Sequence, residues 1–386
     1  MCDKTIEIYI HIPFCVKKCD YCDFLSFASD DDTKLAYVNV LIKEIEQEAG
    51  KYADRLVCSI FRGGGTPSAL PIGCIEDIIK SLRNHYDILK DAEITIECNP
   101  GTLTKDKLEE YKASGINRLS IGLQSTDDRE LRLLGRIHDY KTFLDNYRLA
   151  REVGFNNINI DLISGLPRQK VNDFEVSLKR VIELNPEHIS CYSLIVEEDT
   201  PFYDKYSEGR ANEIEMPGEE IDREIYHLAG ELLEEAGYHR YEISNYSKQG
   251  YECKHNIGYW TRREYIGFGL GSASLYNNVR WNNTRDIKKY HDCILQGVNS
   301  KEDEEALSIK EQMEEYVFLG LRLIDGISLD DFEKTFDTQL FDIKEYRVHT
   351  ERMLKEGLLE LVSDNLRLTS KGLDLANYVM SGFIMD

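Results

Sequence analysis

Short apolar runs alternate with longer amphipathic stretches along the first 200 residues, and this alternation limits the folds open to the chain. Runs rich in Ile, Val and Leu occur at 6–12, 56–61, 93–97, 118–123, 157–163 and 188–196. The stretches between them carry apolar residues at helical spacing, as in Leu178, Val181 and Ile182. Strands that alternate with helices build right-handed βαβ units and a parallel sheet. Six such units predict an α/β fold, an open, partial (β/α)6 TIM-like barrel, with a doubly wound sheet as the alternative.

Changes in composition divide the chain into three predicted parts. We assign residues 1–235 to the barrel and residues 236–300, which are rich in Tyr and Gly, to a linking region. Residues 301–386 begin with Glu-rich stretches of helical spacing and continue with two short apolar runs around Ser363-Asp364-Asn365. Helices followed by a hairpin predict a C-terminal α+β winged-helix-like domain.

Three of the ten cysteines lie within eight residues, with the spacing Cys15-x3-Cys19-x2-Cys22, shortly after the first predicted strand. Thiolates so close together can bind three irons of a [4Fe–4S] cluster and leave the fourth iron open to another ligand. A zinc site and three inert thiols are the alternatives. Zinc normally takes four ligands, and no second Cys-x2-Cys or His-x3-His pair accompanies the first, so the pattern favours the cluster.

Glycines and polar residues gather where other predicted strands end. The turn Gly63-Gly64-Gly65-Thr66-Pro67 follows the second strand, Glu97 ends the third and Gln124 ends the fourth. Asp161 lies near the end of the fifth strand. In barrels and in doubly wound sheets alike, ligands bind beyond the carboxyl ends of the strands. The sequence therefore predicts one site shared by these residues and the three cysteines.

The segment Tyr9-x-His11-x-Pro13-Phe14-Cys15-x3-Cys19-x-Tyr21-Cys22 resembles the signature of the radical SAM superfamily, in which an aromatic residue precedes the third cysteine. The resemblance implies a [4Fe–4S] cluster on Cys15, Cys19 and Cys22 that chelates the amino and carboxylate groups of S-adenosylmethionine (SAM). It also implies a reductant, because an electron passed through the cluster would cleave SAM to methionine and a 5′-deoxyadenosyl radical.

Further segments resemble one subgroup of that superfamily, the oxygen-independent coproporphyrinogen III oxidases and their relatives. They are Ile96-Glu97-Cys98-Asn99-Pro100-Gly101, Ser120-Ile121-Gly122-Leu123-Gln124, Gly135-Arg136 and Asp161-Leu162-Ile163-x-Gly165-Leu166-Pro167. The resemblance implies that the glycine turn contacts the amino group of SAM, that carboxylates and amides bind the ribose, and that a guanidinium pairs with the methionyl carboxylate. The SAM contacts so implied are Tyr9, Tyr21, Gly64, Gly65, Thr66, Glu97, Gln124, Arg136 and Asp161.

The segment Lys254-His255-Asn256-Ile257-Gly258-Tyr259-Trp260 is similar to the His-Asn-x-x-Tyr-Trp motif of the HemW haem chaperones within this subgroup. The resemblance implies that His255 ligates haem iron and that the aromatic pair packs against the macrocycle, with Cys253 as a rival ligand. Phe24 stands where the oxidases carry a further cysteine, and fourteen residues precede Cys15 where the oxidases have an extended arm. Both departures argue against coproporphyrinogen III dehydrogenase activity.

We therefore expect a radical SAM haem chaperone that binds haem and delivers it to acceptor haem proteins. The alternative is an enzyme, oxygen-independent coproporphyrinogen III dehydrogenase, and a radical SAM tRNA-modifying enzyme is a weaker one. The net charge of −23 argues against binding nucleic acid. The winged-helix-like segment is itself acidic, so we do not expect it to bind DNA. The chain shows no apolar run long enough to span a membrane and no secretory signal, so we expect it in the cytoplasm.

Overall fold

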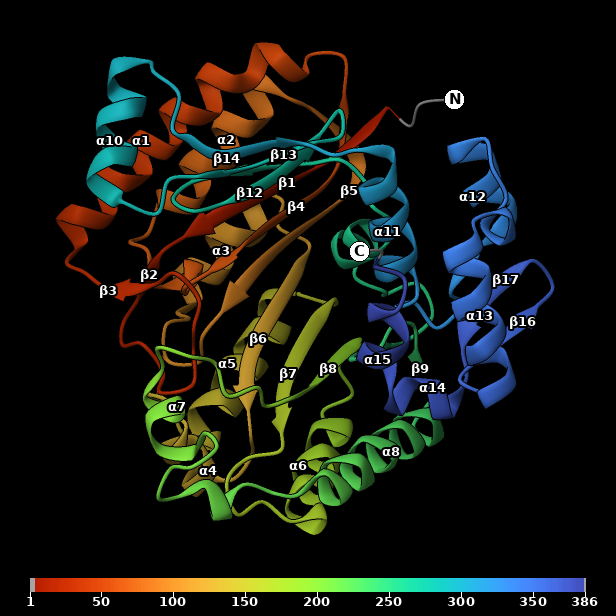
Figure 1. Ribbon diagram of the computed structural model, residues 1–386. Coiled ribbons are helices and arrows are strands. Elements are labelled where there is room, and N and C mark those ends of the chain that lie inside the picture. The colour runs from red at the N-terminus through yellow and green to blue at the C-terminus, as the bar shows by residue number, and fades with distance from the viewer. Residues whose placement is uncertain (1–3, 385–386) are drawn as a thin grey trace.

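The computed structural model describes residues 4–384, and its largest element is a sheet of twelve strands (Figure 1). In sheet order the strands are β14 (Lys301–Ala306), β13 (Val279–Asn283), β12 (Ala273–Tyr276), β11 (Tyr265–Phe268), β1 (Thr5–Ile12), β4 (Leu56–Gly64), β5 (Asp87–Cys98), β6 (Arg118–Gln124), β7 (Ile158–Ser164), β8 (His188–Ser193), β10 (Asn245–Ser247) and β9 (His239–Arg240). From β1 to β8 the paired strands are parallel and follow chain order. This order confirms the partial barrel and excludes the doubly wound alternative, in which the strand order reverses.

The residues predicted to link two domains, 236–300, supply strands to both edges of the sheet. β10 pairs with β8 and with β9 in antiparallel fashion at one edge. At the other edge β11 is parallel to β1, and β12 and β13 follow as antiparallel neighbours. The chain thus crosses from one side of the barrel to the other within this segment, and β14, which follows it, ends the sheet beside β13.

Helices cover one face of the sheet (Figure 1). They are α1 (Asp31–Glu48), α2 (Cys74–His85), α3 (Lys105–Ala113), α5 (Tyr140–Val153), α6 (Val171–Glu183) and α8 (Glu219–Glu235). Successive strand residues point to opposite faces, so Ile6, Ile8 and Ile10 of β1 pack in the apolar core that includes these helices. Glu7 and His11 alternate with them and point to the barrel interior, where they are also buried. The interior face of this barrel is therefore polar.

Shorter elements complete the barrel. β2 (Phe14–Cys15) and β3 (Phe27–Ala28) pair in parallel and enclose the loop that carries the cysteines. The other helices of this part are α4 (Asp128–Leu133), α7 (Pro201–Tyr206), α9 (Lys254–Trp260) and α10 (Ile287–Gln296). None of the helices within residues 4–384 is long and apolar enough to cross a membrane.

The C-terminal unit has its own apolar core, which includes Val317, Phe332 and Leu366. Its helices are α11 (Ile309–Gly320), α12 (Leu329–Phe336), α13 (Lys344–Glu356), α14 (Ser370–Asp374) and α15 (Ala376–Ser381). β16 (Leu359–Val362) and β17 (Asn365–Leu368) form the predicted hairpin, and β15 (Ile327–Ser328) pairs with β17. Figure 1 shows α11 between the large sheet and the rest of this unit.

The glycine turn after β4 packs directly against the backbone after β1. The Gly65 amide donates to the Ile12 carbonyl over 2.9 Å. A Cβ atom at Gly65 would lie 2.8 Å from the carbonyl oxygens of Ile12 and Phe14. This approach is open only to glycine, and it joins the turn to the start of the cysteine loop.

Gly65→Ala should therefore destabilise the protein by about 1–3 kcal/mol, because the new methyl group overpacks rigid backbone. Thermal or urea unfolding measures the change. Gly50→Ala is the matched control, since a Cβ there meets nothing within 4 Å, and its stability should equal or slightly exceed that of the wild type. Equal stability of the two variants would contradict the packing described here.

Candidate functional site

A cavity of about 630 Å³ lies at the carboxyl ends of the parallel strands. Eleven of the thirteen predicted site residues line it: Cys15, Cys19, Tyr21, Cys22, Gly64, Gly65, Thr66, Glu97, Gln124, Arg136 and Asp161. The strand register explains why they meet, since it sets Glu97 of β5 beside Ser120 of β6, and Gly122 of β6 beside Asp161 of β7. The predicted shared site is thus a single cavity in the structure.

The three cysteine thiols are partly exposed and free. The Thr66 hydroxyl lies 3.4 Å from Cys15 Sγ, and Arg136 Nη1 lies 3.6 Å from Cys19 Sγ, so both are placed to donate to sulfur. Burial raises the pKa of the Cys22 thiol to about 11, so metal binding there must release a proton. Three thiols around one cavity with donors aimed at two sulfurs fit an iron–sulfur cluster.

A cluster presents a separate iron to each cysteine, whereas a single ion needs its ligands to converge on one point. Within residues 4–384, no group of three or more His, Cys, Asp or Glu side chains is placed to hold a single metal ion.

The glycine turn is held against the third strand as well as the first. The Gly64 amide donates to Glu97 Oε2 over 3.2 Å, and Thr66 N donates to the Phe14 carbonyl over 2.7 Å. Gly64 has a φ of +101°, and a Cβ there would lie 2.3 Å from the His11 ring. The turn therefore places its backbone and the Thr66 hydroxyl at the cavity wall, and its packing leaves no room for a side chain at Gly64.

Two buried carboxyl groups, those of Glu97 and Asp161, line the cavity close enough to interact. Burial, together with the negative charge of Asp161, raises the pKa of Glu97 to about 8. Burial also raises the pKa of Asp161, although Asn159 Nδ2 donates to it over 2.7 Å. At neutral pH Glu97 is therefore largely protonated, and it can donate as well as accept hydrogen bonds.

Arg136 joins the cysteine loop to the end of β6. Its Nη1 lies 3.4 Å from the Tyr21 hydroxyl, and its Nη2 donates to the carbonyl of Gly122 over 2.5 Å and to the side chain of Asn99. The remaining donor, Nε, is buried without a partner in the described residues. Gln124 adopts a φ of +73°, which is rare outside glycine and turns the chain sharply at the cavity.

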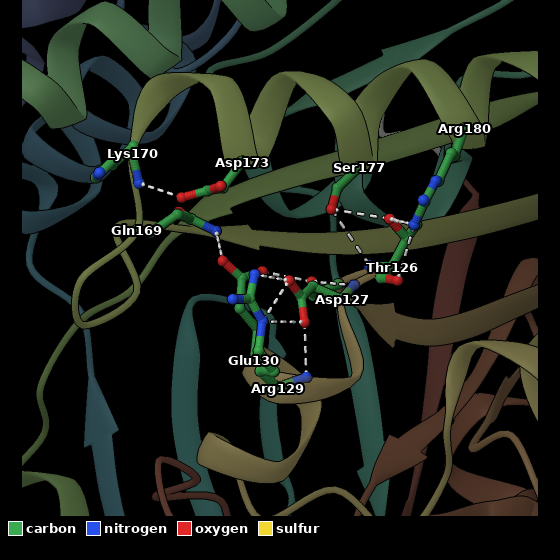
Figure 2. Close-up of polar contacts among 10 residues, drawn as sticks. Thr126, Asp127, Arg129, Glu130, Gln169, Lys170, Asp173, Ser177 and Arg180 are labelled. Carbon is green, nitrogen blue, oxygen red and sulfur yellow. Dashed lines mark hydrogen bonds and ion pairs between the residues drawn. The ribbon is translucent and has the colours of Figure 1, made fainter.

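The polar contacts in Figure 2 fix the loop after Gln124 and the following α4 to α6 and to the turn before it. Thr126 N donates to Ser177 Oγ over 3.3 Å, and Gln169 Nε2 donates to Glu130 Oε1 over 3.0 Å. Arg180 Nη1 donates to the Thr126 carbonyl over 3.2 Å. These contacts hold both chain segments that carry Gln124 and Arg136.

Tyr9 does not line this cavity. It precedes the end of β1 by three residues, or about 10 Å, and so lies deeper in the barrel. Its hydroxyl is 3.1 Å from His11 Nδ1, and its ring lines a second, smaller cavity. Its contact with SAM stays a prediction.

Other polar residues of the cavity wall were not predicted. Asn99, Arg118, Asn159, Ser190 and Asn256 line it as well. Arg118 of β6 and Asn159 of β7 alternate with apolar residues that point to the other face of the sheet. This alternation in the sequence could have predicted that both side chains point into the barrel.

α9, which carries the His-Asn-x-x-Tyr-Trp segment, lies inside the barrel rather than on its surface. The Glu93 carboxylate of β5 accepts from Lys254 N over 3.0 Å and from His255 N over 3.2 Å. A carboxylate at a helix N-terminus satisfies free amides and favours the helix dipole. Glu93 thereby sets the position of α9, with Asn256 at the large cavity and Tyr259 at the small one.

His255 is 1% exposed, and both of its ring nitrogens have partners. Nδ1 is 2.7 Å from Ser59 Oγ, and Nε2 is 3.1 Å from the Tyr259 hydroxyl. Burial lowers the pKa of His255 to about 3, and the Arg118 charge acts in the same direction. The imidazole is therefore neutral, which is the form that ligates iron, but in this conformation its nitrogens are not free. Haem ligation by His255 stays a prediction.

Comparisons with known proteins agree on one relationship. Residues 9–181 match the radical SAM superfamily and residues 307–375 match the HemN C-terminal domain. The heme chaperone HemW of Bacillus subtilis (strain 168) is 35% identical over 97% of this chain and 98% of its own length. The heme chaperone HemW of Lactococcus lactis subsp. lactis (strain IL1403) is 32% identical over 100% of this chain and 99% of its own length. The fold resembles that of the coproporphyrinogen III oxidase HemN from Escherichia coli, with a TM-score of 0.86 and 26% identity over 99% of this chain and 90% of that one.

Cys19→Ala should remove the brown absorbance and most of the iron and sulfide that anaerobic reconstitution adds to the wild type, because a cluster here depends on all three thiolates. Cys74→Ala is the control, since this thiol is buried on α2 outside the cavity. Iron and sulfide retained in Cys19→Ala would contradict the assignment of the cysteines.

Glu97→Gln should make stability less dependent on pH. The folded protein keeps a proton on Glu97 up to about pH 8, whereas the unfolded chain releases it near pH 4.3, so folding stability falls as the pH rises through this window. The neutral amide of Glu97→Gln does not lose stability in this way. The difference in melting temperature, variant minus wild type, should therefore be larger at pH 8 than at pH 5 by at least about 2 °C. The exposed Glu109, changed to Gln, should show no such trend. Parallel pH profiles for Glu97→Gln and the wild type would refute the buried carboxylic acid.

Proposed function

Because the chain belongs to the HemW family of the radical SAM superfamily, we propose that it binds haem and transfers it to acceptor haem proteins. The relatives that carry the name heme chaperone align with nearly the whole chain, so the likeness covers both the barrel and the C-terminal unit.

The placement of α9 is the observation that carries this proposal. One helix of seven residues supplies Asn256 to the large cavity, Tyr259 to the small cavity and a neutral His255 between them. Among residues 4–384, the Tyr259 hydroxyl alone occupies Nε2 of His255. Rotation of the Tyr259 side chain would free this nitrogen for iron, while Ser59 keeps Nδ1 engaged and the ring oriented.

In this proposal Cys15, Cys19 and Cys22 hold the [4Fe–4S] cluster, and the wall formed by Thr66, Glu97 and Asp161 binds SAM. When bound, these groups supply one-electron chemistry, for which an external reductant is needed. The chain itself positions the ligands: Arg136 and Thr66 donate to cysteine sulfur, and protonated Glu97 can bind a ribose hydroxyl. We place the protein in the cytoplasm, where thiols remain reduced.

A second candidate function is coproporphyrinogen III dehydrogenase activity, since the fold matches HemN over nearly its full length. Phe24 argues against it. This residue, which stands in place of the oxidases' further cysteine, is 63% exposed and lines the large cavity. Decarboxylation of coproporphyrinogen III by the reconstituted protein would establish the enzyme and overturn the chaperone proposal.

Haem added anaerobically to the wild type should give a saturable Soret shift that His255→Ala weakens by about tenfold or more. Tyr259→Phe should bind more tightly than the wild type, because the hydroxyl no longer occupies Nε2. His85→Ala is the control, since His85 is exposed on α2 in the outer helix layer. A wild-type titration that never saturates would refute haem binding. Equal affinity in the wild type and His255→Ala would refute this ligand.

A further inference from the structure

The small cavity, of about 340 Å³, lies between the extended edge of the sheet and the C-terminal unit. Tyr9 of β1, Tyr259 of α9 and Tyr265 of β11 line one part of it, and Leu275 of β12 and Leu319 of α11 line another. The Tyr259 and Tyr265 rings meet edge to face, with centroids 4.8 Å apart. Aromatic and aliphatic walls of this kind suit a flat apolar ligand.

Two arginines line the same cavity and share one carboxylate. Arg262 Nε donates to Glu315 Oε2 over 2.8 Å, and Arg280 Nη2 lies 2.8 Å from Glu315 Oε1. Arg262 and Glu315 are only 11% and 17% exposed, so solvent screens this pair little. Two guanidinium groups joined by a single carboxylate form a site whose chemistry is specific for carboxylate.

Arg262 retains an unused donor. Nη1 donates to Asn278 Oδ1 over 3.0 Å, but Nη2 is buried without a hydrogen-bond partner among the described residues. The residue also adopts a φ of +57° in the turn directly after α9. This φ ends the helix in the usual way, because Arg262 N donates to the Tyr259 carbonyl over 3.1 Å and Arg263 N donates to the Gly258 carbonyl over 2.8 Å. The helix ending fixes the backbone of Arg262, and the unpartnered Nη2 leaves its guanidinium with a donor for a ligand.

The cavity is adjacent to the predicted haem ligand. Tyr259 forms part of its wall, and the hydroxyl of the same side chain contacts His255 Nε2. A ligand that displaces the Tyr259 side chain would therefore reach the imidazole from this cavity. The arginine pair lies at the same cavity, where it can hold charged substituents of that ligand.

We propose that this cavity receives the propionate-bearing part of haem, and that one propionate replaces Glu315 between Arg262 and Arg280. The inference rests on the proposed function and adds a recognition site to it. Glu315 belongs to α11, so the exchange releases a contact between the C-terminal unit and the barrel. A cavity of this size is at the low end for organic ligands, so binding of the macrocycle requires α11 to move outward.

The test compares haem with haem dimethyl ester, in which both propionates are neutral, by Soret titration of the full-length protein. The wild type should bind haem about tenfold or more tightly than the ester. Arg262→Gln and Arg280→Gln should lose this preference. Glu315→Gln should bind haem at least about fivefold more tightly than the wild type and should not change affinity for the ester.

Glu314→Gln is the matched control. Glu314 is the preceding residue of α11 and pairs with Lys310, so its replacement should leave both affinities unchanged. Thermal melting checks that each variant is folded. If the arginine variants are unfolded, the comparison of Glu315→Gln with Glu314→Gln is sufficient to test the carboxylate site.

Two negative outcomes are distinguishable. Saturable, His255-dependent binding with equal affinity for haem and its ester, unaltered in Glu315→Gln, would overturn the carboxylate site and leave the proposed function standing. A wild type that binds neither ligand would overturn the proposed function and the site together.

Discussion

The contact between the Glu93 carboxylate and the first turn of α9 determines the interior of this protein. A barrel whose strands present Glu7, Glu93 and Arg118 inward must satisfy these groups, because buried unpaired charges are costly. Glu93 accepts from the two free amides at the start of α9, and it thereby holds a helix in the space between the strands. This contact helps to place His255 and Tyr259, together with the hydrogen bond between His255 and Ser59.

Local sequence was sufficient for the strands, the outer helices and most of the large cavity. The alternation of apolar runs predicted β1 and β4 to β8, and parallel strands necessarily bring their carboxyl ends together. Thus Glu97, Gln124 and Asp161 could be assigned to the cysteine site although they are far apart in the chain. Position within the strands and their chain order predicted one shared site, whereas the role of each residue in binding SAM was implied by the resemblance to a known family.

Long-range packing explains what the sequence did not reveal. Glu93 and His255 are 162 positions apart, and no local pattern shows that one caps the helix of the other. Residues 236–300 lack strong periodicity because their short strands extend opposite edges of one sheet. Tyr9 lines the small cavity, and its contact with SAM, which the resemblance implies, stays a prediction.

The closeness of α9 to the strands has a consequence for how this segment can evolve. A Cβ at Gly258 would lie 2.0 Å from Oε1 of the fully buried Glu7, so this face of the helix packs on β1 with no space for a side chain. Each residue of a helix is rotated by about 100° from the last, and an inserted residue would turn every later side chain toward a different neighbour. Point substitutions can leave the frame of the motif intact, whereas insertions and deletions between Cys253 and Arg262 cannot. The length of this stretch is therefore as strongly constrained as the identity of its residues.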